Sequence, residues 1–268
     1  MSVYKNDNAY HFDRALESIT DAQSIKPSEI VLVVDGPIND QIEGVIEKYT
    51  KKYNIFNVIR LQNNRGLGNA LKIAVENSSY ELIARMDSDD ISLPNRFANQ
   101  IKMFLENESI EVVGGDIAEF IGDETNIVAY RRVPVYDLEI KEYLKKRCPL
   151  NHVSVMYKKS AVQRAGGYID LFWNEDYYLW IRMAECGVVM ANTGTVLVNV
   201  RTGDDMYKRR GGKKYFESEK YLQKYMLDRK MIGTMTYILN ILKRWILQVL
   251  LPSSIRGWVF RRFARKGK

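Results

Sequence analysis

Hydrophobic and polar positions along the first two thirds of the chain follow two different periods in turn. Short runs of β-branched and aliphatic residues, such as "EIVLVVDG" (29–36), predict buried strands. Stretches with apolar residues three and four positions apart, such as "NDQIEGVIEKYTKKY" (39–53), predict amphipathic helices. Strands alternating with helices predict an α/β domain with a largely parallel sheet. Ligands of such sheets bind at the carboxyl ends of the strands.

The same pattern places the other elements. Further strands are predicted at 57–63, 80–87, 110–121, 152–157 and 188–201. Further helices are predicted at 13–20, 66–78, 94–107 and 175–187, and the chain becomes helical again from Tyr215. Glycines and charges in "GDDMYKRRGGKK" predict a boundary there, which gives a catalytic domain at 1–205 and a helical region at 206–268.

Composition narrows the class of protein. The 268 residues are 46% hydrophobic, enough for one sizeable core with a tail. Cys148 and Cys186 are too few for a disulfide scaffold, so a reducing compartment is expected. The polar, charged segment after Met1 does not resemble a signal peptide.

Charge is distributed unevenly along the chain. Residues 206–268 contain 17 lysines and arginines but only 3 acidic residues, whereas residues 1–205 carry a net charge of −7. A basic tail of this kind indicates contact with an anionic surface, either a membrane or a nucleic acid. The alternative is a solvated basic helix.

An acidic cluster ends the predicted strand 80–87. In "ELIARMDSDDISLP", Asp87, Asp89 and Asp90 surround Ser88. Like charges this close repel one another unless a cation neutralises them, and carboxylate oxygens suit Mg²⁺ or Mn²⁺. The alternative is a solvated turn before the next helix. We favour the metal site because a second acid, Asp35, also follows a predicted strand.

Two turns lie near this cluster in the predicted topology. Asp35, in "VVDGP", is placed either to accept hydrogen bonds from a nucleotide or to form a simple turn. "NNRGLGNAL" resembles a dinucleotide fingerprint, but Leu71 replaces its third glycine, which argues against NAD. Arg65 is left at a glycine turn into a helix, where it would meet a phosphate or a base.

A second pair of acids opens a later helix. Glu175 and Asp176 lie among aromatic residues in "WNEDYYLW". Such acids are ordinary helix caps, or one of them is a general base. His152 lies alone in a strand-like run and is expected to be a core or hydrogen-bonding residue.

These motifs, in this order, resemble the family 2 glycosyltransferases, especially the bacterial sugar transferases of amylovoran, capsule and O-antigen synthesis. The stretches that carry the resemblance are "MSVYKND", "ALESI", "LVVDGPIND", "NRGLGNAL", "ARMDSDDIS" and "AGGYIDLFWNEDYYLWIRM". They cover about residues 2–201. The resemblance implies the GT-A fold, a Rossmann-like three-layer sandwich with a mostly parallel central sheet.

The resemblance also implies a role for each candidate residue. Tyr4, Asp35 and Arg65 would bind the uracil end of a UDP-sugar. Asp87 would contact the ribose side and assist Asp89, which would hold Mn²⁺ or Mg²⁺ against the diphosphate. Asp176 would be the general base. The donor-binding residues implied by the resemblance are Tyr4, Asp35, Arg65, Asp87, Ser88 and Glu175.

The implied activity is that of an inverting, metal-dependent hexosyltransferase. It would move a hexose or N-acetylhexosamine from a UDP-sugar to a saccharide carried on a polyprenyl diphosphate, at the cytoplasmic face of the plasma membrane. Two alternatives are a nucleotidyltransferase that uses the acid cluster with Mg²⁺, and a non-catalytic protein that binds nucleic acid through the basic tail. No lysine-rich phosphate loop supports the first, and the acidic main domain would repel nucleic acid.

The two ends of the chain carry further expectations. The family has several apolar residues before the position of Ser2, so either the start is assigned too late or most of a central strand is missing. In the tail, apolar residues recur at helical spacing. They are Ile238, Leu239, Leu242, Trp245, Ile246, Val249 and Leu250. We expect this stripe to anchor the protein on an anionic membrane, although packing on the catalytic domain is the alternative.

Overall fold

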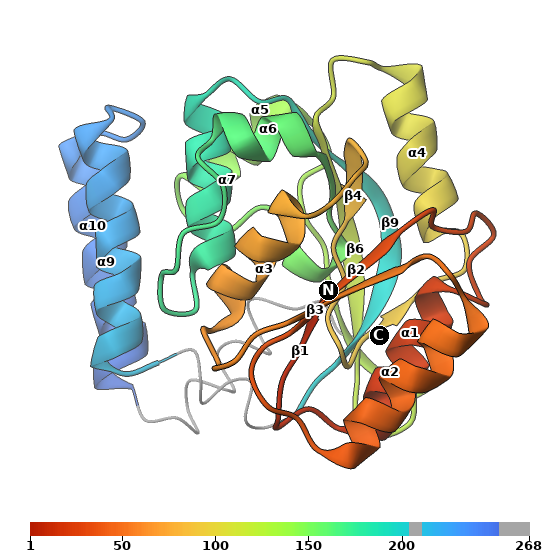
Figure 1. The fold of residues 1–268 in the computed structure, drawn as a ribbon. Coiled ribbons are helices and arrows are strands. Elements are labelled where there is room, and N and C mark those ends of the chain that lie inside the picture. The colour runs from red at the N-terminus through yellow and green to blue at the C-terminus, as the bar shows by residue number, and fades with distance from the viewer. Residues whose placement is uncertain (204–210, 252–268) are drawn as a thin grey trace.

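The computed structural model describes residues 1–203 and 211–251. Figure 1 shows an α/β domain with helices on both sides of its strands and a pair of helices at one edge. The expected domain boundary at 205/206 lies outside the described residues, and the division at that point stays a prediction.

The elements follow the alternating pattern of the sequence, with additional short strands. The strands are β1 (Ser2–Val3), β2 (Ile30–Val34), β3 (Phe56–Arg60), β4 (Leu82–Ala84), β5 (Ile91–Ser92), β6 (Val112–Phe120), β7 (Ile127–Arg131), β8 (Met156–Lys158) and β9 (Met190–Arg201). The α-helices are α1 (Ala9–Ile19), α2 (Asp40–Lys52), α3 (Leu67–Glu76), α4 (Arg96–Glu106), α5 (Asp137–Leu144), α6 (Lys159–Arg164), α7 (Glu175–Glu185), α9 (Lys213–Asp228) and α10 (Thr234–Trp245). Two shorter helical segments are η1 (His152–Ser154) and η2 (Ile246–Leu250).

The strands form two sheets. One sheet, β1-β2-β3, is parallel throughout. The other has the order β4-β8-β6-β9-β5, with β7 beside β6, and within it only β6 and β9 pair in parallel. The α/β architecture and the parallel arrangement of β1–β3 are as predicted, whereas the second sheet is more antiparallel than the sequence pattern suggested. The predicted strand at 152–157 is also different, because η1 occupies its first half.

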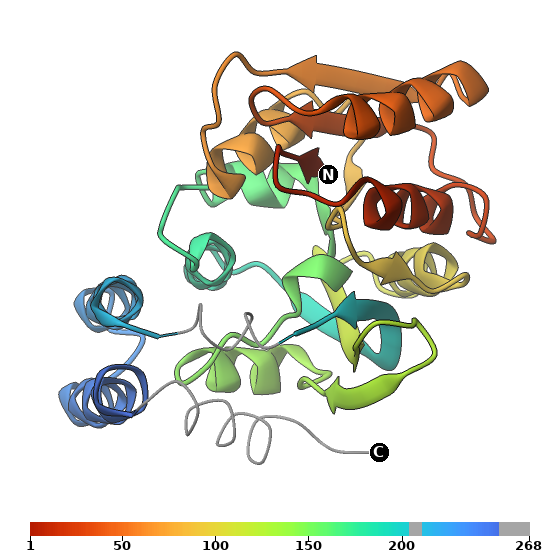
Figure 2. The same ribbon diagram turned by 90° about the horizontal axis from the view of Figure 1, so that it is seen from below.

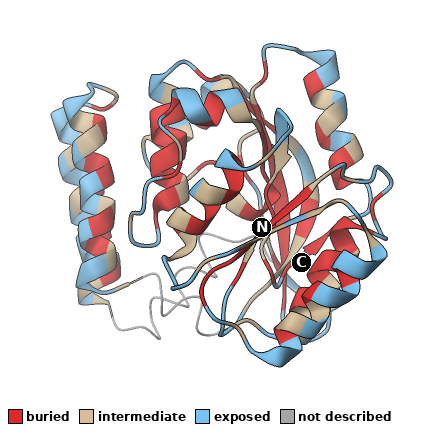
Figure 3. Cartoon of the chain, in the orientation of Figure 1, coloured by how far each residue is buried: buried red, intermediate tan, exposed pale blue. Residues whose placement is uncertain are grey.

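Two hydrophobic cores lie on opposite faces of these strands, which produces the three layers. In β6, Val112 packs with α7, whereas its neighbour Val113 packs with α1, α2 and α4. Successive side chains of a strand point to opposite faces, so one strand serves both cores. Trp180 of α7 is fully buried in the first core. Figure 3 shows the buried residues concentrated along the strands and the inward sides of the helices.

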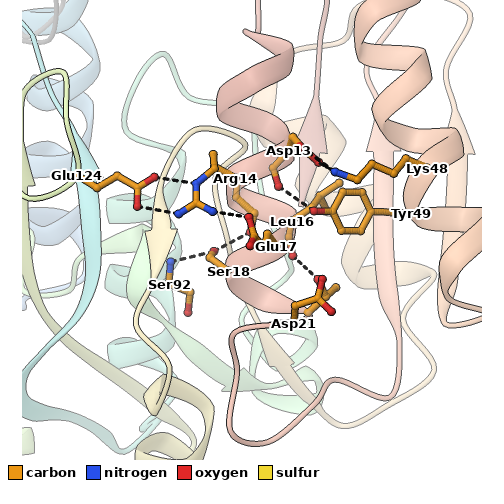
Figure 4. Close-up of polar contacts among 12 residues, drawn as sticks. Asp13, Arg14, Leu16, Glu17, Ser18, Asp21, Lys48, Tyr49, Ser92 and Glu124 are labelled. Atoms are coloured by element: carbon orange, nitrogen blue, oxygen red, sulfur yellow. Dashed lines mark hydrogen bonds and ion pairs between the residues drawn. The ribbon is translucent and has the colours of Figure 1, made fainter.

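Helix α1 connects the layers through polar contacts (Figure 4). Lys48 of α2 donates to the Asp13 carboxylate at 2.7 Å, and Arg14 forms a two-bond ion pair with Glu124 at 3.0 Å. The buried Ser18 hydroxyl accepts the Ser92 N–H of β5 at 3.0 Å. These contacts hold the amino-terminal loop and the start of the second sheet in a fixed relation.

The first strand, β1, is two residues long and pairs with β2. Beyond its start, a cavity of about 460 Å³ separates β2 from β4. It is lined by Met1, Val31 and Leu82–Met86, together with apolar residues of α3 and α4. The Met1 ammonium group reaches the Val31 carbonyl at 2.9 Å, and burial lowers the pKa of that ammonium to about 5. Figure 2 shows this terminus at β1, the edge strand of the parallel sheet.

Candidate active site

Asp35 follows β2 and organises the glycine turn before α3. Its carboxylate accepts the backbone N–H of Arg65 at 2.7 Å and that of Gly66 at 3.0 Å, while Asn64 Nδ2 donates at 2.9 Å. The side chain is only 5% exposed. The turn interpretation and the ligand interpretation are therefore compatible, because a carboxylate has about four lone-pair sites and three are engaged.

The glycine turn lies against two other loops. A Cβ on Gly36 would stand 2.7 Å from the Asn64 backbone nitrogen, and the φ of Gly36 is +89°, so only glycine fits there. A Cβ on Gly68 would stand 3.2 Å from the Cα of Asp170. The turn that carries Arg65 is thus packed between the end of β2 and the loop that leads into α7. Arg65 itself is exposed.

The acidic cluster follows β4 and rests on a buried arginine. Arg85, only 4% exposed, forms an ion pair with Asp87. Its guanidinium group neutralises one carboxylate of the cluster from below. A charged residue inside the apolar run "ELIARM" was the signal for this role, but the sequence analysis did not single it out.

A further acid, which the sequence did not reveal, joins this cluster from the amino-terminal loop. Asp7 Oδ2 accepts the Ser88 hydroxyl at 2.9 Å and the Tyr4 N–H at 3.0 Å. Asp7 therefore connects Tyr4, which is 38% exposed, to the loop that carries the acids. In the sequence Asp7 stands directly before the α1 cap residue Asn8, so it was indistinguishable from an ordinary helix-start acid.

The acids of this cluster fall into two kinds. Asp89 reaches solvent. Partial burial of its carboxyl group, followed by the charges of Asp87 and Asp7, raises the pKa of Asp89 to about 6. Asp90 is 3% exposed and accepts the Arg201 N–H at 2.8 Å, and burial raises its pKa well above the usual range. Asp89 is therefore available to a ligand, whereas Asp90 ties β5 to the end of β9.

Glu175 and Asp176 begin α7 with different surroundings. Glu175 is 8% exposed, and burial, followed by the charge of Asp176, raises its pKa to about 7. The Cys148 thiol lies 3.9 Å from Asp176 Oδ2. A carboxyl group that keeps its proton near neutral pH is suited to donate a hydrogen bond.

Arg85 brings the two acidic groups into one electrostatic field. Its positive charge lowers the pKa of Asp89 on one side and of Glu175 on the other. Both carboxylates must lie within range of the same buried guanidinium for this to occur. The acids after β4 and the start of α7 thus share the influence of one buried positive charge.

His152 lies in the wall of the site and is hydrogen-bonded, as expected. Its Nε2 is 2.9 Å from the Tyr168 hydroxyl, and its ring meets Trp180 edge-on. Burial, followed by the charge of Arg85, lowers the pKa of His152 well below its usual value, so the ring is neutral. His152 therefore has a structural role, in contact with Tyr168 and Trp180.

The donor set fits a hard divalent cation shared with a substrate. Within 1–203 and 211–251, no group of three His, Cys, Asp or Glu side chains is arranged to enclose a metal. Asp89 and Asp87 supply oxygen ligands that would leave the remaining positions to diphosphate and water, the usual arrangement for Mg²⁺ or Mn²⁺.

The sequence profile described as Glycosyl transferase family 2 matches residues 4–172. This range includes the turn at Asp35 and the acidic cluster, and it ends just before α7.

Three curated relatives match along almost their full length. An uncharacterized glycosyltransferase of Haemophilus influenzae is 38% identical, over 99% of this chain and 98% of the relative. The amylovoran biosynthesis glycosyltransferase AmsE of Erwinia amylovora is 32% identical, over 100% and 98%. The UDP-Gal:alpha-D-GlcNAc-diphosphoundecaprenol beta-1,3-galactosyltransferase of Escherichia coli is 32% identical, over 99% and 95%.

Solved structures share the fold at low sequence identity. The Staphylococcus aureus protein TarS in complex with UDP-GlcNAc matches with a TM-score of 0.64 and 16% identity, over 91% of this chain and 72% of that one. The mannosyltransferase PcManGT of Pyrobaculum calidifontis, in complex with GDP-Man and Mn²⁺, matches with a TM-score of 0.61 and 14% identity, over 98% and 74%. With the family profile and the full-length relatives, this establishes that the chain is a glycosyltransferase of family 2 with the GT-A fold.

Proposed function

We propose that this glycosyltransferase moves a hexose or N-acetylhexosamine from a UDP-sugar to a hydroxyl group of a polyprenyl-diphosphate-linked saccharide, with inversion, in surface polysaccharide synthesis. The observation that carries the proposal is the acidic cluster after β4, where Asp87 pairs with the buried Arg85, whose charge also acts on Asp89 and Glu175. Relatives described as an amylovoran and a diphosphoundecaprenol-dependent transferase support the substrate class. Family membership removes the support for the two alternatives, a nucleotidyltransferase and a nucleic-acid-binding protein.

The donor lies along the carboxyl ends of β1, β2 and β4 in this proposal. Asp35 uses its remaining acceptor site for the base, Tyr4 stacks near the uracil, and the exposed Arg65 approaches the uracil or the diphosphate. Asp87 contacts the ribose side, and Ser88, fixed by Asp7, supports it.

Asp89, assisted by Asp87, holds Mn²⁺ or Mg²⁺ against the diphosphate. The cation would neutralise the negative charge of the departing UDP. Without it, burial and then repulsion from Asp87 raise the pKa of Asp89. Arg85 relieves only part of that repulsion, so the pair is suited to a cation.

Asp176 accepts the proton of the acceptor hydroxyl. The hydroxyl oxygen forms a bond to the anomeric carbon while the bond from that carbon to the diphosphate oxygen breaks, and the bonding electrons leave with UDP. A single displacement inverts the anomeric configuration. Glu175, with its pKa raised to about 7, holds a proton beside Asp176 and is placed to donate a hydrogen bond to the donor sugar.

The test separates Asp176 from its neighbour. Asp176→Asn should lower the rate of transfer by about 10²–10⁴-fold while UDP-sugar affinity is kept, because only the acceptor proton needs a base. Glu175→Gln, the matched control on the same helix turn, should weaken donor affinity and lower the rate less. The measurement is UDP release with a synthetic polyprenyl-diphosphate-sugar acceptor, alongside donor binding by calorimetry. Loss of donor binding in Asp176→Asn would assign this residue to the donor site instead.

A further inference from the structure

Helix α10 is amphipathic in the reverse sense to an ordinary surface helix. Its polar residues Asn240 and Arg244, and Gln248 of the following η2, are 6–9% exposed. The large apolar residues of α10 and η2 are 40–68% exposed on the opposite side. They are Met235, Ile238, Leu239, Leu242, Trp245, Ile246 and Leu250, here termed the α10 stripe. Figure 3 shows the pair α9 and α10 at the edge of the domain, with exposed residues on its outward side.

The buried polar contacts fix the rotation of α10. Asn240 Nδ2 donates to the Lys145 carbonyl at 2.9 Å and to Gln223 Oε1 of α9 at 2.8 Å. Arg244 donates to the Lys146 carbonyl at 2.9 Å and forms a nearly buried ion pair with Glu219. Turning the stripe inward would break these bonds and leave buried polar groups unpaired. The packing alternative for the stripe therefore fails within the described residues.

We propose that the α10 stripe is a contact surface for an anionic lipid bilayer and lies in the plane of the interface. The stripe places seven exposed, large apolar residues on one side of a helical segment, and exposed apolar patches mark interaction sites. Trp245 within the stripe and the exposed Lys243 beside it are typical of interfacial helices. No helix in the described part of the chain is long and apolar enough to cross a bilayer.

Charge distinguishes a lipid surface from a second copy of the chain. Within the described residues 211–251, 8 lysines and arginines against 3 acidic residues give a net charge of +5, which anionic head groups complement. Two such surfaces facing each other would repel. The bilayer is therefore the occupant that the charges favour.

The stripe is connected to the candidate active site through two helix contacts. Asn174, which caps α7, donates to the Ser218 hydroxyl of α9 at 3.0 Å, and the Tyr178 ring packs edge-on against Tyr221 and Tyr225. Helix α7 begins with the proposed base Asp176. The inference rests on the proposed function in one respect: a polyprenyl-linked acceptor presents its sugar near the bilayer, where this helix pair would hold the site.

The test uses the full chain and vesicles. Ile238→Gln with Leu242→Gln changes two half-exposed stripe residues, and Leu105→Gln, 77% exposed on α4, is the matched control. Wild type and control should co-sediment with vesicles of phosphatidylcholine and phosphatidylglycerol at low salt, and less so with phosphatidylcholine alone. The stripe variant should partition at least about tenfold less. All three should have the same melting temperature.

Three outcomes would overturn the proposal. The first is a wild type that does not bind anionic vesicles. The second is a stripe variant that melts well below wild type, which would mean that the stripe is covered within the chain. The third is a wild-type dimer that the stripe variant dissociates. UDP release without vesicles keeps this test separate from the proposed function. It should be equal in wild type and stripe variant, whereas vesicle binding without any UDP release would contradict the function alone.

Discussion

At the scale of single residues, burial determines which acids can do chemistry. Asp90 and Asp89 are neighbours in the sequence, yet only Asp89 reaches solvent. Glu175 and Asp176 are also neighbours, and the buried Glu175 holds its proton to a higher pH. The degree of burial thus gives neighbouring carboxyl groups different roles.

Replacement of Asp89 by Asn should remove metal binding without harming the fold. Wild type in Mn²⁺ and UDP at about a hundred times the dissociation constant should gain about 2.7 kcal/mol, which raises the melting temperature by about 5–10 °C. Asp89→Asn should show no such rise, and its ligand-free melting temperature should equal or exceed that of wild type because one repulsive charge is removed.

The control for this prediction is Glu106→Gln on the exposed side of α4, which should behave as wild type. An Asp89→Asn protein that keeps the full Mn²⁺-dependent rise would show that the metal binds elsewhere.

Glu175 should make stability depend on pH. Its pKa is about 7 in the folded chain and ordinary in the unfolded chain, so the folded state binds more protons between these values. Stability from this group is therefore present at low pH and lost as pH rises through about 7. Glu175→Gln should stabilise the protein at pH 8 relative to wild type, and much less at pH 5. Melting temperatures across this range test it, with the exposed Glu142→Gln as control.

At the scale of elements, hydrophobic periodicity predicted the positions of several strands and of the acids that follow them. The runs that became β2, β3 and β6, and the acids that follow β2 and β4, were correctly placed. Pairing partners were not, because β8 and β9 join the second sheet through contacts between distant residues that no local pattern expresses. Asp7 and Arg85 were missed for a related reason. Each acquires its role only in the folded chain, where it contacts a residue of the acidic cluster.

The cavity between β2 and β4 gives an element-scale prediction. In the parallel register, Asp35 N–H meets the Val3 carbonyl and Val33 N–H meets the Met1 carbonyl, so a residue preceding Met1 would continue the ladder toward Val31. A four-residue Val/Ile extension before Met1 should fill part of the cavity. A gain of roughly 2 kcal/mol would raise the melting temperature by about 4–8 °C.

A Gly/Ser extension of equal length is the matched control, since it supplies backbone groups but little apolar surface. Both proteins are compared with the unextended chain by thermal unfolding. Equal melting temperatures for the two extensions would mean that the cavity does not accept a strand.

At the scale of the whole molecule, packed helices connect the candidate active site to the α10 stripe. Helix α9 packs against α7 through Leu222 and Met226, which belong to the same core as Trp180. The proposed acceptor is half sugar and half lipid. Such a substrate would suit a donor site at the strand ends and a base at the start of α7, with an apolar surface two helices away.

The most direct test of the central proposal is the anomeric configuration of the product. Purified protein is incubated with Mn²⁺, an α-linked UDP-sugar chosen from a panel by UDP release, and a synthetic polyprenyl-diphosphate-sugar acceptor, and the product is analysed by NMR. Inversion by a single displacement predicts a β-glycoside whose formation requires the metal and is nearly abolished by Asp176→Asn. An α-glycoside, or unchanged transfer in Asp176→Asn, would contradict the single displacement assigned to this site.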